Sequence, residues 1–120
     1  MIERIPGLPG NVLGISASGT VTAADYESIV IPAVEEMLKQ HDKLNLLYHL
    51  GPDTKGFEMG AVWDDARVGW GHYAAWDKIA VVSDIEWIRG LAAAMDYLFP
   101  AYVRVFHDTE LEDAKTWISE

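Results

Sequence analysis

The sequence LNLLYHLGPDTKGFEMGAVWDDARVGWGHYAAWDKIAVVS, which runs from Leu44 to Ser83, decides the fold of this chain. It begins with one apolar run, LNLLYHL (Leu44–Leu50), and ends with another, KIAVVS (Lys78–Ser83). Short runs of this kind are typical of strands that are covered on both faces, as in a parallel sheet. Between them, Asp53–Trp76 holds three of the five tryptophans and four of the ten glycines. The stretch therefore predicts two buried strands that are joined by a turn and an aromatic helix.

Upstream of this stretch, the chain predicts an antiparallel hairpin. Met1–Ile5 is a short strand that ends before Pro6, and Val12–Ser18 alternates as a strand with one face in the core. The turn-forming sequence PGLPGN lies between them. Gly19–Thr22 is expected to end the second strand, so the sheet should carry one antiparallel edge.

A helix is predicted between the hairpin and Leu44. Thr22 and Asp25 have the spacing of a capping pair, and apolar residues recur at helical spacing as far as Leu38. Pro32 lies inside this pattern and removes one helical hydrogen bond. We expect either a kink or two helical pieces, with Pro32 in the first turn of the second piece.

Downstream of Ser83, the pattern predicts a helix, a strand and a second helix. Asp84 is the expected cap of a helix from Ile85 to about Phe99, which Pro100 ends. The side chains that this helix is expected to bury are Trp87, Ile88, Leu91, Ala94 or Met95, and Leu98. Ala101–Phe106 is the last predicted strand. In the final helix, Thr109 and Glu112 have capping-box spacing, and the residues expected to face inward are Ala114, Trp117 and Ile118.

The resulting order of elements is β-β-α-β-α-β-α-β-α. Alternation of strands and helices predicts an α/β fold, with a mostly parallel sheet of four to five strands, an edge hairpin and about four helices. Because the chain has 120 residues and shows neither a linker nor a repeat, we expect a single domain over residues 1–120.

Composition excludes several classes of function. The net charge of −10 repels phosphates and no Lys/Arg cluster offsets it, so nucleic-acid binding is not expected. The chain has no cysteine, which excludes disulfides, thiolate catalysis and thiolate metal sites. No apolar run approaches the ~20 residues that span a bilayer, and the N-terminus lacks a signal-peptide pattern. We therefore expect a cytoplasmic protein without a membrane span.

Aromatic residues recur on one face of the helix predicted after Asp53. Met59, Trp63, Trp70 and Tyr73 follow this spacing, together with Ala66. Core packing is the first interpretation, since aromatic residues dominate cores and interfaces alike. The second is an aromatic wall that lines a pocket or contacts a partner. The surplus of tryptophan favours it, because a small domain has limited interior.

The sequence shows no catalytic or metal-binding motif. The four histidines lack metal-ligand spacing, and neither a phosphate-binding glycine motif nor a nucleophile elbow is present. His49 and His107 end two strands, so they are expected at the carboxyl edge of the sheet, where Asp53 or Asp84 could complete a site. Surface or capping positions are the first interpretation of these histidines, and such a site is the alternative. We expect no metal, no cofactor and no enzymatic activity.

The residues and their order together resemble the SpoIIAA-like (STAS/SEC14-type) family of small domains. The resemblance runs over nearly the whole chain. The matching pieces are G-T-V-T-x-x-D-Y (Gly19–Tyr26), Pro32, L-L-Y (Leu46–Tyr48), G-F-E-x-G-A-x-W-x-D (Gly56–Asp65), V-V-S-D-x-x-W (Val81–Trp87), V-R-V-F (Val103–Phe106) and A-x-x-W (Ala114–Trp117). The resemblance implies a STAS-like sheet of four or five strands, often dimeric, that serves binding rather than catalysis.

Better-understood relatives in this resemblance are anti-sigma factor antagonists, which carry a phosphorylatable serine in a D-S-S-G-like turn after the third strand. The corresponding turn here is Asp53–Gly56. Thr54 offers its only hydroxyl, and Lys55 replaces the second small hydroxyl residue. Thr54 is therefore the position at which a phosphoswitch would lie. The lipid-exchange relatives use a larger cavity and more helices than this chain supplies.

These observations lead to a ranked set of hypotheses. The first is a non-enzymatic binding or regulatory module that engages a protein partner, including its own copy as a homodimer, through Asp53–Trp76. The second is a carrier of a small apolar or lipid-like ligand, and the third is a phosphoswitch at Thr54. The residues predicted to form the ligand or partner surface are Thr54, Phe57, Met59, Trp63, Trp70, Tyr73 and Trp76.

Overall fold

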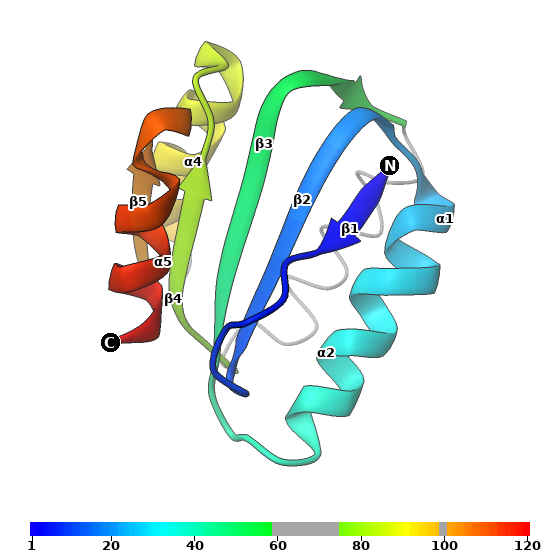
Figure 1. Cartoon of the computed structure of the whole chain (residues 1–120), viewed down its shortest axis with the longest axis vertical. Coiled ribbons are helices and arrows are strands. Elements are labelled where there is room, and N and C mark those ends of the chain that lie inside the picture. Colours follow the sequence, from blue (N-terminus) through cyan, green and yellow to red (C-terminus); the bar gives the residue numbers. More distant parts are fainter. Residues whose placement is uncertain (59–74, 99–100) are drawn as a thin grey trace.

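The fold is a five-stranded, mostly parallel sheet with helices on both faces, as a computed structural model shows for residues 1–58, 75–98 and 101–120 (Figure 1). The strands lie in the order β1-β2-β3-β4-β5, with β1 antiparallel to β2 and every other neighbouring pair parallel. The described elements are β1 (Ile2–Arg4), β2 (Val12–Val21), α1 (Ala23–Asp25), η1 (Tyr26–Val30), α2 (Ile31–Leu38), β3 (Leu44–Phe57), β4 (Trp76–Val82), α4 (Glu86–Leu98), β5 (Tyr102–Phe106), η3 (Asp108–Glu110) and α5 (Leu111–Ser119). The predicted α/β class and its antiparallel edge are confirmed.

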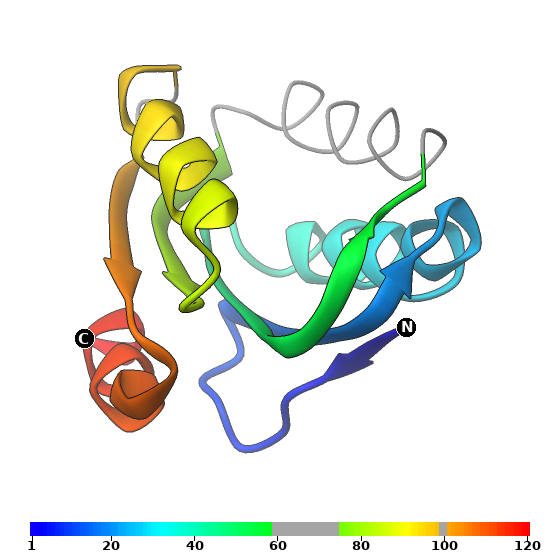
Figure 2. The same cartoon turned by 90° about the horizontal axis from the view of Figure 1, so that it is seen from above.

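The two faces of the sheet carry separate cores. Figure 2 shows α1, α2 and α4 above one face and α5 on the opposite side. Tyr48 of β3 packs in the cluster that contains Val34 of α2 and Ile88 of α4. Its neighbour Leu47 points the other way and packs in the cluster that contains Ile118 of α5. Because successive side chains of a strand alternate between faces, burial on both sides accounts for the nearly continuous apolar run of β3.

The proline-containing helix forms in two α-helical pieces, as predicted. Thr22 caps the first turn: its hydroxyl accepts from the N–H of Asp25, and the Asp25 carboxylate accepts from the N–H of Thr22. A π-helical segment, η1, then separates α1 from α2, and the Ile31 N–H donates to the Tyr26 carbonyl, five residues back. Pro32 lies in the first turn of α2, where its missing N–H costs least.

Strands β2 and β3 run further than predicted, and the expected turn at Asp53–Gly56 is wrong. β2 continues to Val21, and Gly19 adopts a left-handed φ of +60° at an irregularity in the β2–β3 register. Thr54 pairs with Gly19 across this irregularity. The turn-forming residues stay extended because each strand supplies backbone partners for the other, which local sequence does not reveal.

The buried face of α4 also differs from the prediction. Ile88 and Ala92 are buried, whereas Trp87 is 48% exposed and Leu91 is 59% exposed. Ala94 is exposed, and the side chains of Met95 and Leu98 lie outside the described residues. One edge of the apolar stripe of α4, with Ile88 and Ala92, therefore packs on the sheet, and the other edge, with Trp87 and Leu91, is partly exposed.

The start of the last helix is shifted toward the N-terminus. Thr109 and Glu112 were the predicted capping pair, but the His107 N–H donates to Glu110 Oε1 at 2.8 Å and a 3₁₀ turn, η3, precedes α5. Ala114 and Ile118 are fully buried as predicted.

Candidate functional site

An apolar pocket lies between β3, β4 and α4 on the face of the sheet that α2 also covers. Its volume is about 230 Å³. None of its described lining residues is charged. They are Leu46, Tyr48, Leu50, Phe57, Ile79, Val81, Trp87, Ile88, Leu91 and Ala92. This is the described feature best suited to hold a molecule, because ligand sites are typically concave, apolar and sparsely polar.

The alternation of the two strands builds the floor of this pocket. Residues two apart on a strand share a face, so Leu46 and Tyr48 of β3 lie on the same side as Ile79 and Val81 of β4. The register confirms this placement, since Leu46 pairs with Ile79 and Tyr48 pairs with Val81.

The outer wall of the pocket is an aromatic pair. Phe57, at the end of β3, meets Trp87 of α4 edge to face, with ring centroids 5.9 Å apart and an interplanar angle of 85°. This geometry is favourable because the positive edge of one ring faces the negative face of the other. Leu91 lies one helical turn beyond Trp87, and about half of each side chain is open to solvent. An occupant of the pocket would cover them.

Polar atoms in the described wall are few. Tyr48 and Trp87 alone, of the described lining residues, carry side-chain hydrogen-bonding groups. The Tyr48 hydroxyl is buried and lies 2.9 Å from the hydroxyl of Tyr26 in η1. In the described wall, these groups are therefore the Tyr48 hydroxyl, which bonds to Tyr26, and the indole of Trp87, whose side chain is half exposed.

The structure places the predicted surface residues in several locations. Phe57 lines the pocket, whereas Trp76 is 4% exposed and belongs to the main core. Thr54 is buried, and its hydroxyl donates to the Ala17 carbonyl at 3.3 Å. A kinase would have to reach a hydroxyl inside the sheet, and phosphorylation of Thr54 stays a prediction. The other predicted residues, Met59, Trp63, Trp70 and Tyr73, lie outside the described residues.

The sequence pattern places Trp87 and Leu91 on the buried side of α4, although Trp87 is one of four tryptophans of which some were expected to be only partly buried, and it does not single out Tyr48. The signal for Trp87 and Leu91 was their position on the same helical stripe as Ile88, which is too wide for one sheet contact. Tyr48 carried no such signal, because its partner Tyr26 is 22 residues away in the chain.

A second group of polar side chains lies at the carboxyl edge of the sheet, as predicted from the strand order. His107 Nδ1 lies 2.9 Å from Asp84 Oδ1, and His49 Nε2 lies 3.3 Å from Asp108 Oδ1. His107 thus meets Asp84, one of the two candidate partners, whereas the partner of His49 is Asp108. The hydrogen bond with His107, with a second from the Asp108 N–H, lowers the pKa of Asp84 below its ordinary value.

This carboxyl-edge group joins elements rather than surrounding a cavity. Asp84, predicted to cap α4, accepts instead from the N–H of Asp108 at 3.2 Å. Arg89 of α4 donates to the carbonyls of Ser83 and Phe106, the residues at the ends of β4 and β5. Within the described residues, no three metal-ligating side chains converge on a point that could hold an ion. In the same part of the chain, no helix is long and apolar enough to cross a membrane.

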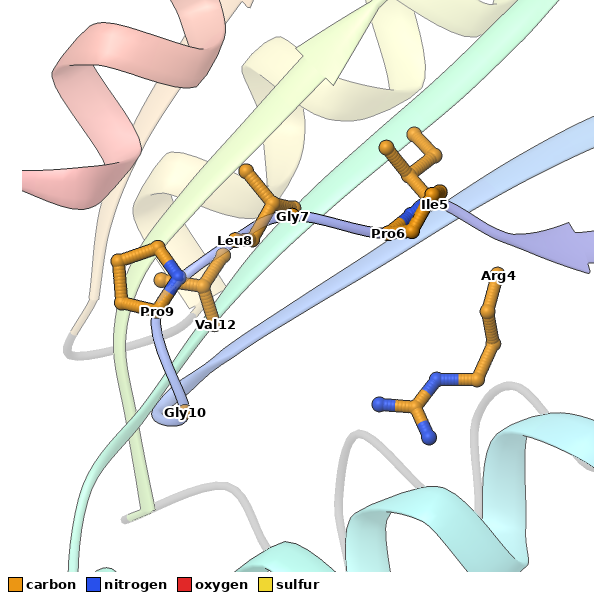
Figure 3. Close-up of a pocket in the computed structure, with 8 residues that line it drawn as sticks. All are labelled: Arg4, Ile5, Pro6, Gly7, Leu8, Pro9, Gly10 and Val12. Carbon is orange, nitrogen blue, oxygen red and sulfur yellow. The ribbon is translucent and has the colours of Figure 1, made fainter.

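Another hollow lies beside the loop between β1 and β2 (Figure 3). It has a volume of about 330 Å³, and its wall is mostly the proline- and glycine-rich loop that follows Ile5. Arg4 points away from this loop, and it also borders a shallow hollow with Pro32 and Glu36 of α2. Charged side chains border both hollows, whereas the described wall of the pocket beneath α4 carries none.

The sheet, its helices and the pocket beneath α4 define a small α/β domain with an apolar cavity on one face of its sheet. The chain belongs to the SpoIIAA-like family, whose model matches residues 12–119. It is similar to an uncharacterized protein from the DUF3478 family of Shewanella loihica PV-4 that has a SpoIIAA-like fold, with 22% sequence identity and a TM-score of 0.76. The match covers 98% of this chain and 92% of that one. No curated protein matches the sequence.

Proposed function

We propose that this protein is a non-enzymatic binding module that holds a small apolar ligand in the pocket between β3, β4 and α4. The observation that carries the proposal is a cavity of about 230 Å³ with no charged residue in its described wall. A dry apolar cavity of about 150 Å³ is enough to bind benzene. Burying about 200 Å² of ligand surface contributes about 5 kcal/mol, so weak but measurable affinity is expected before any polar contact is added.

Filling the pocket from within tests this proposal. Ala92 is buried in the pocket wall, and Ala93, its neighbour on α4, is exposed. Ala92→Leu should displace the ligand because the added carbons occupy the cavity, whereas Ala93→Leu should leave binding unchanged. The measurement is a titration with toluene, followed by NMR shifts of the Ile79, Val81 and Leu50 methyl groups.

Two results would overturn the proposal. One is an absence of toluene-dependent shifts in the native protein at concentrations near the solubility of toluene. The other is equal binding by both variants, which would place toluene elsewhere. Native mass spectrometry of protein purified without denaturation gives an independent readout, because a retained adduct should be lost in Ala92→Leu and kept in Ala93→Leu.

Contact with a protein partner is the second candidate. The segment first assigned to it, Asp53–Trp76, lies mostly outside the described residues, but other aromatic side chains favour it. Tyr97 is 91% exposed and Tyr102 is 71% exposed, and large exposed aromatic side chains are enriched at interfaces. Pull-down and sedimentation of a Tyr97→Ser/Tyr102→Ser variant test it. Unchanged partner capture and an unchanged monomer–dimer balance would remove these two side chains from any interface.

A further inference from the structure

β5 is the last strand of the sheet, so one of its two edges has no strand partner among the described residues (Figure 2, orange). An unpaired edge presents a row of backbone N–H and C=O groups that can pair with another strand. Resting on the second candidate function, contact with a protein partner, and not on the pocket, we propose that this edge pairs with β5 of a second copy of the chain. The two strands run antiparallel about a two-fold axis at Val103.

The pairing of β5 with β4 shows which of its backbone groups face outward. The Ser83 N–H donates to the Phe106 carbonyl at 3.0 Å, so the backbone of Phe106 faces β4. The β4–β5 register has no irregularity. Because successive residues of a strand turn their N–H and C=O groups to opposite edges, Arg104 also faces β4, whereas Val103 and Val105 face the free edge. These two valines therefore offer their backbone groups to a partner strand.

The side chains of β5 divide between the two faces of the sheet. Val103 is half-buried and packs against the core beneath α4. Tyr102 and Arg104 lie on the opposite face with Phe106, and Tyr102 is 71% exposed. The Arg104 guanidinium lies 4.8 Å from the ring centroid of Phe106 and 5.3 Å from that of Trp117, and it forms no ion pair with a described residue. A positioned cation and an exposed phenol ring thus flank Val103.

A two-fold axis at Val103 makes these two side chains complementary. It sets Val103 opposite Val103 of the other copy, and it sets Tyr102 of each copy opposite Arg104 of the other. The same contact then forms twice, as an isologous interface requires. Such a pair is of the non-hydrogen-bonded kind, in which opposite side chains lie closest, and a guanidinium beside a phenol ring is attracted to its face.

The neighbouring register lacks this complementarity. An axis at Arg104 would use the same outward groups of Val103 and Val105, but it would set two arginines directly opposite each other, and like charges at such positions destabilise a strand pair. The net charge of −10 on each copy also opposes association. We therefore expect a weak dimer with its axis at Val103.

Sedimentation equilibrium of the full chain, at up to about 1 mM, measures this association. Native protein should form a reversible dimer. Val103→Pro removes an outward N–H that β4 does not use, so the chain should still fold, and the loss of the two intermolecular bonds should weaken the dimer about tenfold or more. Val103→Thr keeps this N–H and the β-branched shape, and as the matched control it should change the dissociation constant by less than about threefold.

Substitutions at Tyr102 test the register by charge. Tyr102→Lys sets an ammonium group opposite Arg104 at two places in the dimer and should weaken it about tenfold. Tyr102→Glu sets carboxylates there instead and should bind at least as tightly as native protein. Both variants should fold, because Tyr102 is exposed, so they decide the question if Val103→Pro does not fold. An equal response of the dimer to both charges would contradict the register.

Cross-linking tests the register by distance, since the native chain has no cysteine. In an antiparallel pair, directly opposite hydrogen-bonded residues have Cα atoms about 5.5 Å apart, which a disulfide spans. Val103→Cys should therefore form a disulfide-linked dimer on mild oxidation. Val105→Cys should not, because Val105 lies opposite Ala101 and its own copy is four residues further along, about 13 Å away.

Failure of this inference can be told apart from failure of the proposed function. Native protein that stays monomeric at about 1 mM would overturn the edge pairing. A dimer that Val103→Pro leaves intact, or that Val105→Cys cross-links, would do the same. None of these results bears on the pocket, because toluene binding is measured separately. A monomer that captures a foreign partner through Tyr97 and Tyr102 would support the second candidate function and remove only the pairing of two copies.

Discussion

Asn45 joins three elements through its side chain, and its replacement should destabilise the fold strongly. The residue is 5% exposed. Its Nδ2 donates to the Ile118 carbonyl of α5, and its Oδ1 accepts from the Lys78 N–H of β4, both at 3.1 Å. The β3–β4 register shifts between Leu44 and Asn45, where one extra residue enters β4. The Asn45 side chain therefore hydrogen-bonds two backbone groups: the Lys78 N–H at the register shift between β3 and β4, and the Ile118 carbonyl at the C-terminal end of α5.

The structure gives the size of the effect. Asn45→Ala leaves the Lys78 N–H and the Ile118 carbonyl without these partners, and each unsatisfied buried group costs about 1–3 kcal/mol. Partial access of water to the cavity that remains lowers the sum, so we expect about 3 kcal/mol. For a chain of 120 residues, the unfolding entropy of ~2.1 cal/mol/K per residue converts this to a fall in Tm of about 12 °C.

Urea and thermal unfolding, followed by far-UV circular dichroism, provide the measurement, and Asn11→Ala is the matched control. Asn11 is only partly buried, and its side chain makes no hydrogen bond to another described residue, so its loss should cost less than about 0.5 kcal/mol. Equal destabilisation by the two variants would refute the reasoning. So would a changed m-value for Asn45→Ala with an unchanged midpoint, because that result reports altered compactness rather than lost bonds.

Two further predictions concern the carboxyl edge and the glycines. Because folding lowers the pKa of Asp84, its ionised carboxylate stabilises the fold above the ordinary pKa of 3.8, and this stabilisation is lost as pH falls below that value. The unfolding free energy of Asp84→Asn should therefore fall less between about pH 5 and pH 2 than that of native protein. Asp96→Asn, at an exposed position, is the control, and parallel pH curves for Asp84→Asn and native protein would contradict the prediction. Gly19→Ala should destabilise the protein by about 1 kcal/mol because φ at Gly19 is +60°. Gly90→Ala should stabilise it by about 0.5–1 kcal/mol, because Gly90 lies within α4 and a Cβ atom there would meet open space. Urea midpoints of the two variants that move in the same direction would contradict this pair of predictions.

Much of the sheet could be predicted because strands that are buried on both faces appear in the sequence as short apolar runs. Five of the seven residues of β4 and four of the five residues of β5 are apolar, as are five of the seven in Leu44–Leu50. The second half of β3 could not be predicted in this way. Its residues, Gly51–Gly56, are turn formers with no apolar alternation, and they are extended because β2 pairs with them. Such pairing is a long-range property that no local window contains.

The candidate site was predictable only where topology alone brings residues together. Parallel strands end at one edge, so His107 and Asp84 were expected at the same edge of the sheet, and their side chains lie 2.9 Å apart there. The pocket depends instead on how far α4 is rotated on the sheet. That rotation decides whether Trp87 or Ile88 is buried, and both choices satisfy the same apolar stripe. Similarly, the contact of Tyr26 with Tyr48 depends on the path of η1, which the sequence marks only through Pro32.

The misread half of β3 is also what shapes the outer wall of the pocket. β4 pairs with β3 only as far as His49, so the eight residues from Leu50 to Phe57 pair with β2 alone and bend past the end of β4 (Figure 1). Leu50 and Phe57 are seven residues apart, and an odd separation puts side chains on opposite faces of a regular strand. Both nevertheless line the pocket.

The irregular register resolves this conflict. From the Ala17–Leu50 pair to the Gly19–Thr54 pair, β2 advances two residues and β3 advances four; from there to the Thr20–Gly56 pair, β2 advances one and β3 two. These extra residues in β3 change the alternation, so that Phe57 faces α4 and meets Trp87. The left-handed Gly19 lies opposite the irregularity. The glycine and the turn-forming residues that obscured the strand in the sequence are thus what directs an aromatic ring to the pocket.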